Sequence, residues 1–70
     1  PLARANPEIL PAFIAALRDR KPEVRISAVD IVSRIDDPRA RAAIRARNRR
    51  ERDRNVRRVL APAMARLRKD

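Results

Sequence analysis

The 70-residue chain contains no cysteine, histidine, glycine, threonine, glutamine, tryptophan or tyrosine. Without cysteine it can form neither a disulfide framework nor a thiolate nucleophile, and without histidine it lacks the commonest general base and metal ligand. Without glycine it can build neither a phosphate-binding loop nor a dinucleotide-binding turn. The remaining residue types predict a protein that is not an enzyme and that holds no cofactor and no metal ion.

The missing glycine also bears on the turns and on the origin of the chain. Average usage would place about five glycines in a chain of this length. The turns instead carry Asn-Pro, Lys-Pro and Asp-Pro pairs, which is typical of idealised, designed helical proteins. We therefore hypothesise a designed or redesigned origin, with a fragment of a natural protein as the alternative.

Long apolar runs are absent as well. A helix that spans a bilayer needs about 20 consecutive apolar residues, and no stretch of the chain approaches that length. The first residues include Arg4, Asn6 and Pro7, where a signal peptide would be apolar. The sequence predicts neither a membrane segment nor a signal peptide, and it does not indicate a localisation.

Positive charge is what the chain has in excess. Nineteen Lys and Arg residues against nine Asp and Glu residues give a net charge of +10, and 17 of the 19 are arginine. Residues 1–35 hold 12 of the 18 large apolar side chains and a net charge of +2, from six basic and four acidic residues. Residues 36–70 hold the other six and a net charge of +8, from 13 basic and five acidic residues. We expect the first half to build most of the core and the second half to carry the charge.

Apolar residues recur at helical spacing in four segments. The first helix is expected to follow Asn6 as its N-cap, the second to begin near Pro22, and the third to follow Asp37. The fourth is expected to follow Asp53 or Asn55. These segments predict an all-α protein whose short loops make consecutive helices antiparallel neighbours.

Two features weaken the second half of this pattern. The third segment has a poor apolar side, made of Ala40, Ala43 and Ile44 followed by Arg47, so we expect stability to depend on a partner or on self-association. In the fourth segment Pro62 removes one backbone hydrogen bond. A kink or break is therefore expected near Pro62.

An internal repeat appears when the chain is compared with itself. A shift of 31 residues aligns Asn6-Pro7 with Asp37-Pro38, Ala12-Phe13 with Ala43-Ile44 and Ala15 with Ala46. A shift of 32 residues aligns Val24-Arg25 with Val56-Arg57, Val32 with Met64 and Ile35 with Leu67. A period near 31 with two helices in each unit is typical of α-hairpin repeats, in which each unit buries its apolar face against the next.

At these positions the chain resembles HEAT-like repeats, especially the short phycobilin-lyase type. The resemblance is carried by Asn6-Pro7, Leu17-Arg18-Asp19, Val24-Arg25 and the run Ile35-Asp36-Asp37-Pro38-Arg39-Ala40. It implies two stacked helical hairpins in a single domain over residues 1–70, with units at 6–36 and 37–69; a compact four-helix bundle is the alternative. It also implies a scaffold for protein association, although some HEAT-like proteins grip DNA along a basic concave face.

The second unit departs from the family's pattern where apolar residues are expected, at Arg45, Arg47, Asn48 and Arg49, and again at Pro62. The third helix is expected to present one polar face, opposite Ala40, Ala43 and Ile44, made of Arg41, Arg45, Asn48, Arg49 and Arg52. Guanidinium groups pair bidentately with carboxylates and phosphates. We therefore predict a partner-binding face made of Arg41, Arg45, Asn48, Arg49, Arg52, Arg57 and Arg58.

The sequence favours an acidic protein or peptide as the partner of this face. Arginine suits interface ion pairs with carboxylates, and the chain lacks the threonine, glutamine and stacking aromatic residues that nucleic-acid binders use. Nucleic acid is the alternative, because the turn before the third helix resembles a helix-turn-helix with Arg41, Arg45 and Asn48 as base readers. The neighbouring Asp36-Asp37 pair is interpreted as a helix cap rather than as a catalytic pair.

Overall fold

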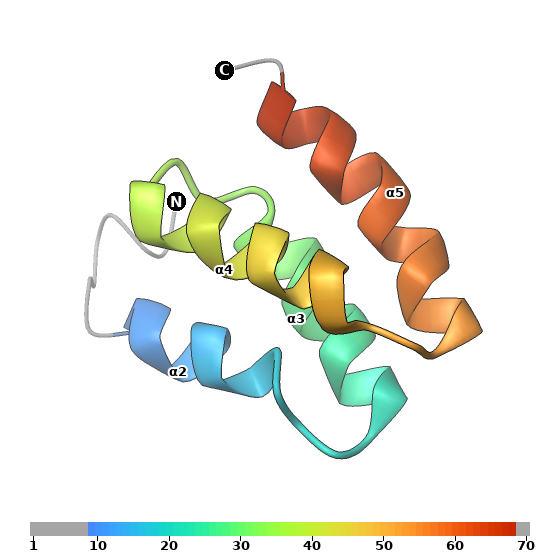
Figure 1. The fold of residues 1–70 in the computed structure, drawn as a ribbon. Helices are drawn as coiled ribbons and strands as arrows, with labels where there is room; N and C mark the ends of the chain where they lie inside the picture. Colours follow the sequence, from blue (N-terminus) through green and yellow to red (C-terminus); the bar gives the residue numbers. More distant parts are fainter. Residues whose placement is uncertain (1–8, 69–70) are drawn as a thin grey trace.

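The computed structural model describes residues 9–68. These residues form four helices and no strand: α2 (Ile9–Ala16), α3 (Pro22–Val32), α4 (Pro38–Arg50) and α5 (Arg54–Arg68). Helices α2 and α3 form one hairpin and α4 and α5 a second, and consecutive helices run in opposite directions (Figure 1). Helix α2 packs against α4 and α3 against α5. The protein is all-α, and of the two predicted architectures it adopts the stacked hairpins.

The second and third predicted helix starts are confirmed. Helix α3 begins at Pro22 and α4 at Pro38, since the fixed φ of proline suits the first helical position and its missing N–H costs nothing there. Asp37 caps α4, because its carboxylate accepts a hydrogen bond of 2.7 Å from the backbone N–H of Arg39. The predicted cap Asn6 and the proline after it lie outside the described residues.

The fourth helix start resolves to one of its two candidates. Oδ1 of Asp53 accepts hydrogen bonds from the backbone N–H groups of Asn55 and Val56, at 2.8 and 3.1 Å, so Asp53 rather than Asn55 caps α5. No residue between 9 and 68 has a positive φ. The connections therefore close without the backbone conformation for which glycine is usually chosen.

The break expected at Pro62 does not occur. Helix α5 runs on through Pro62 to Arg68. Pro62 is exposed, whereas the opposite side of the helix is buried through Val56, Leu60, Ala63 and Leu67. Burial of that side, before and after the proline, keeps the helix continuous despite the lost hydrogen bond.

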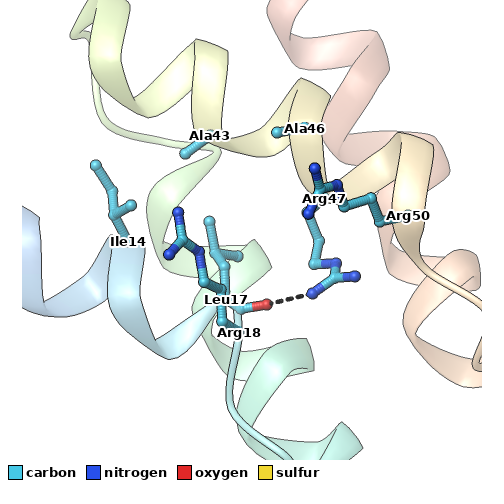
Figure 2. Close-up of a pocket in the computed structure, with 7 residues that line it drawn as sticks. All are labelled: Ile14, Leu17, Arg18, Ala43, Ala46, Arg47 and Arg50. Atoms are coloured by element: carbon cyan, nitrogen blue, oxygen red, sulfur yellow. Dashed lines mark hydrogen bonds between the residues drawn. The ribbon is translucent and has the colours of Figure 1, made fainter.

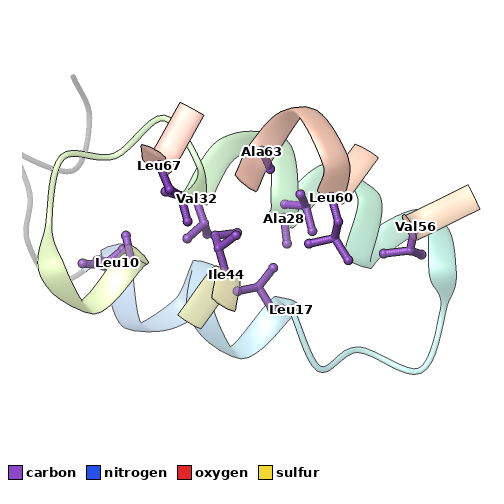
Figure 3. Packing of buried hydrophobic residues seen from close by; sticks show 11 residues of the cluster. Leu10, Leu17, Ala28, Val32, Ile44, Val56, Leu60, Ala63 and Leu67 are labelled. Atoms are coloured by element: carbon purple, nitrogen blue, oxygen red, sulfur yellow. The ribbon is translucent and has the colours of Figure 1, made fainter. Parts of the chain in front are cut away.

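One apolar core joins the four helices (Figure 3). Its buried residues are Leu10, Leu17, Ala28, Val29, Val32, Ala40, Ile44, Val56, Leu60, Ala63 and Leu67. Phe13 and Met64 pack against the edge of this core and are half-buried. Helix α4 buries only Ala40 and Ile44, which agrees with its predicted poor apolar side and leaves its other residues available for polar contacts.

Candidate functional site

The most buried charge in residues 9–68 is the carboxylate of Glu51, at the end of α4. Its side chain is 2% exposed. Arg25 of α3 makes a bidentate contact with this carboxylate: Nε donates to Oε1 at 2.9 Å and Nη2 donates to Oε2 at 3.0 Å. The backbone N–H of Asp53 donates to Oε2 at 3.0 Å. This bidentate pair ties the first hairpin to the second, because Arg25 and Glu51 belong to different hairpins.

A second arginine reaches the same carboxylate from within α4. Nε of Arg47 lies 3.2 Å from Oε1 of Glu51 but has no hydrogen-bond partner, so this contact is electrostatic. Its Nη1 donates to the carbonyl oxygen of Leu17 at 3.0 Å. The repeat pattern expects an apolar side chain at the position of Arg47. The aliphatic part of the arginine takes the place of that side chain, and its guanidinium hydrogen-bonds the chain just after α2.

The charges in this cluster support one another. Burial raises the pKa of the Glu51 carboxyl, but the hydrogen bonds from Arg25 and the Asp53 N–H, together with the charges of Arg25 and Arg47, leave that pKa below its ordinary value of 4.5. The hydrogen bond to Glu51 also raises the pKa of the Arg25 guanidinium. At neutral pH the cluster is thus fully ionised, which is the behaviour of a structural ion pair and not of a group ready to exchange protons.

The two hairpins hold their turns in the same way. Nη1 of Arg25 donates to the carbonyl oxygen of Asp19 at 2.7 Å, and Nη1 of Arg57 donates to the carbonyl oxygen of Glu51 at 2.9 Å. Oδ1 of Asp19 accepts from the N–H of Lys21 at 2.9 Å, as Oε2 of Glu51 accepts from the N–H two residues on. The 32-residue shift found in the sequence therefore relates both arginines and both acids.

The remaining donors of these two arginines differ. Nε and Nη2 of Arg25 hold the Glu51 carboxylate. Nη1 of Arg57 donates to the carbonyl oxygens of Asn48 and Glu51. Its Nε and Nη2 have no acceptor within residues 9–68. Arg57 is exposed, so this half of its fork is open to a carboxylate from outside.

Four members of the predicted binding face are exposed and make no hydrogen bond or ion pair with the described part of the chain: Arg45, Arg49, Arg52 and Arg58. Arg41 is half-buried and its Nη1 lies 3.0 Å from Oδ1 of Asp36. Asn48 is half-buried. The structure thus places the face on the side of α4 away from the core and at the start of α5.

Arg52 does not share the α4 surface as predicted. Helix α4 ends at Arg50, and Glu51 has an extended backbone with φ −70° and ψ 131°. This backbone lets the Glu51 side chain turn inward to Arg25, where its carboxylate also accepts the N–H of Asp53. Arg52 consequently lies on the connection between α4 and α5, beside the helix face rather than on it.

The repeat alignment explains why this face is charged. The shift of 31 residues pairs Leu10 with Arg41, Ile14 with Arg45 and Leu17 with Asn48. In the first hairpin these positions are apolar and pack into the core or against its edge. In the second hairpin, the equivalent positions carry arginine and asparagine, so the surface that would receive a further apolar helix is polar and positive.

A hollow of about 400 Å³ lies between α2 and α4. Figure 2 shows its floor, made of Ile14, Leu17, Ala43 and Ala46, and three arginines around it, Arg18, Arg47 and Arg50. Arg18 and Arg50 are exposed. Sequence reasoning did not single out this hollow, because Arg18 and Arg50 belong to different helical segments and share no motif.

Sequence reasoning also missed the Glu51 cluster. The signal was present in the 32-residue shift, which pairs Asp19 with Glu51 as well as Arg25 with Arg57.

In residues 9–68, no helix is both long and apolar enough to cross a bilayer, and no three acidic side chains gather as they would around a metal ion.

Comparison with known proteins agrees with this architecture. A family model described as HEAT repeats matches residues 2–65. No curated protein and no solved structure matches the chain. HEAT repeats are generally non-enzymatic helical scaffolds and commonly mediate protein interactions. The matched region spans nearly the whole chain and includes both hairpins, and the protein therefore belongs to the HEAT repeat family.

Proposed function

We propose that the protein is a non-enzymatic docking module that binds an acidic protein or peptide. The binding surface, called here the arginine face, consists of Arg41, Arg45, Asn48, Arg49, Arg52, Arg57 and Arg58. In this proposal the face forms one docking surface within a single domain that extends over residues 1–70.

The open fork of Arg57 is the observation that carries the proposal. At the junction between the hairpins, the equivalent Arg25 receives a carboxylate on Nε and Nη2, at 2.9 and 3.0 Å. The same two atoms of Arg57 have no acceptor within residues 9–68. The chain's own junction thus gives a template for the missing contact: a carboxylate that approaches the start of α5 and accepts a bidentate bond.

The composition of the face supports the same class of partner. Because Arg45 and Asn48 replace Ile14 and Leu17 of the first hairpin, an apolar helix placed here would bury guanidinium groups without partners, which is costly. An element that carries carboxylates would neutralise them. Arginines at the rim, such as Arg58, would speed encounter, whereas central ones would set the rate of dissociation.

Nucleic acid is the competing partner, since exposed arginines also bind phosphates. The composition disfavours nucleic acid, because the chain has only two lysines and no threonine or glutamine. Its one aromatic residue, Phe13, is half-buried and not available for stacking on bases. Self-association through the arginine face is disfavoured by a net charge of +10. A designed origin stays a hypothesis from the composition, and it is compatible with either partner.

The proposal is tested by titrating the full chain with two labelled probes at two salt concentrations. One probe is a 20-residue helical peptide of glutamate, leucine and alanine, and the other is random-sequence duplex DNA. We expect the peptide to bind more tightly, and the double variant Arg45→Glu with Arg49→Glu to lose at least tenfold in affinity. DNA affinity should fall steeply with salt, at about 0.9 log units per log unit of salt for each phosphate contacted.

A charge-matched control comes from the first hairpin. Arg20 and Lys21 are exposed, and changing both to glutamate alters the net charge as much as the double variant does. Peptide affinity reduced only by the double variant supports the arginine face, whereas equal losses would indicate non-specific attraction. Tighter binding to DNA than to the peptide, lost in the double variant, would replace the acidic protein with nucleic acid as the partner.

A further inference from the structure

We propose that the hollow between α2 and α4 binds a small organic dianion, in which an apolar body carries a phosphate or a pair of carboxylates. The hollow lies beside α2, and none of the arginine-face residues lines it. It is therefore a second site, and its occupation does not depend on the docking function proposed above.

The charges around the hollow are unbalanced. Arg18, Arg47 and Arg50 line it, and no acidic residue between 9 and 68 does. Arg47 is committed to the Leu17 carbonyl and to Glu51, whereas Arg18 and Arg50 make no hydrogen bond or ion pair with any residue from 9 to 68. Figure 2 shows the Arg18 side chain extending from the turn after α2 and the Arg50 side chain extending from α4. Two free guanidinium forks that converge on one space suit a ligand with two negative charges.

The floor of the hollow indicates that the ligand has an apolar body. Ile14 and Leu17 come from the first hairpin, and Ala43 and Ala46 from the second. The two alanines leave open the space that larger side chains would fill. A volume of about 400 Å³ falls at the small end of the range for ligand sites, about 300–1,000 Å³, and exceeds what a bare inorganic anion occupies. An aromatic or branched aliphatic group would remove this apolar surface from water.

The test is a titration of the full chain, followed by two-dimensional amide NMR, with four probes: phenyl phosphate, phthalate, inorganic phosphate and phenol. We expect the two organic dianions to shift the amide signals of Leu17, Ala43 and Ala46. They should bind at least tenfold more tightly than inorganic phosphate or phenol. Inorganic phosphate can pair only with the arginines, and phenol can pack only on the apolar floor. The better of phenyl phosphate and phthalate identifies the anionic group that the site prefers.

Variants separate this site from general attraction to a basic protein. Arg18→Gln and Arg50→Gln should each weaken binding of the better dianion about tenfold, through the loss of a charged hydrogen bond. Ala46→Leu should abolish it by filling the hollow with no change in charge. The matched controls Arg54→Gln and Ala61→Leu, at exposed positions of α5, should leave it unchanged.

Three results would overturn the proposal. One is equal affinity for inorganic phosphate and phenyl phosphate, which would show that binding depends on the positive charge alone and not on the apolar floor. Another is a loss of affinity in Arg54→Gln as large as in Arg50→Gln. The third is full binding by Ala46→Leu with its helical circular dichroism intact. None of these results bears on peptide binding by the arginine face, so the two proposals fail separately.

Discussion

On the first hairpin, Leu10, Ile14 and Leu17 are apolar and pack into the core or against its edge; at the equivalent positions of the second hairpin, α4 carries Arg41 and Arg45 followed by Asn48. The turns of the two hairpins nevertheless share one contact, because Arg25 and Arg57 bind equivalent carbonyl oxygens. The path of each hairpin is thus fixed by polar contacts at its turn and start. The outward surfaces are then free to differ, one for packing and one for charge.

The second hairpin depends on few apolar contacts, and this sets the largest effect we expect. Ile44 is the one large buried side chain among the residues of α4 and has no exposed surface. Ile44→Ala should lower the free energy of unfolding by about 3–4 kcal/mol, since it removes the transfer contribution and leaves a cavity. Urea denaturation measures it. Ile31→Ala on α3, where the side chain is 39% exposed, should cost less than about 1 kcal/mol. Similar costs at both positions would contradict the view that α4 is anchored by one residue.

The junction between the hairpins gives the next largest effect. Glu51→Gln should cost about 3 kcal/mol of unfolding free energy, because two arginines would keep their charges beside a buried neutral group. The matched variant Asp30→Asn removes a carboxylate that pairs with Arg34 at 3.1 Å, with both side chains more than half exposed. That change should be barely measurable by denaturation. If the two variants cost the same, the Glu51 cluster does not join the hairpins.

Acid should weaken the same junction more gradually. The pKa of Glu51 lies below 4.5 and that of Asp37 below 3.8 in the folded protein, and for Asp37 the first cause is its hydrogen bond with Arg39. The unfolded chain therefore binds more protons in acid. The stability from these groups is fully present above their ordinary pKa values and is lost as the pH falls through the folded ones. Melting temperatures from pH 7 to pH 2.5 should fall below about pH 4.5, and fall less in Glu51→Gln.

The smallest effect concerns the two prolines inside helices. Pro62 stands in the middle of α5, where it removes a hydrogen bond, whereas Pro11 stands in the first turn of α2 as described, where little is lost. Pro62→Ala should raise the free energy of unfolding by part of the roughly 3 kcal/mol that proline costs relative to alanine in a helix interior, and Pro11→Ala should leave it nearly unchanged. Equal effects of the two substitutions in thermal unfolding would show that Pro62 introduces no local defect for the burial of α5 to offset.

Much of the fold could be predicted from local rules. A helix start such as Asp37-Pro38 and the helical spacing of apolar residues are set by residues that lie close together in the sequence. The predicted break at Pro62 was wrong because a local rule met a tertiary effect: the buried side of α5 continues past it. The alternative, a kink there, stays a prediction. Arg47 was recognised as a departure, but its contact with the Leu17 carbonyl required the position of α2.

The candidate site was less accessible to sequence reasoning. Glu51 stands among arginines in the sequence and looks like any acid on a charged surface. Its burial follows only from the end of α4 at Arg50 and the approach of α3. Arg45, Arg49 and Arg58 are exposed, and both the binding face and its partner stay predictions.

The absence of positive φ angles between residues 9 and 68 has a consequence for mutational scanning. In many proteins a few sites tolerate only glycine because of their backbone conformation, and those sites confuse maps of binding surfaces. Here every described backbone position accepts a side chain without that penalty. Apart from substitutions to proline and glycine, which act on a helix through its backbone, the tolerance of each position in a saturation library should report its side-chain surroundings. Positions that are sensitive in binding but not in folding would then outline a partner's footprint directly.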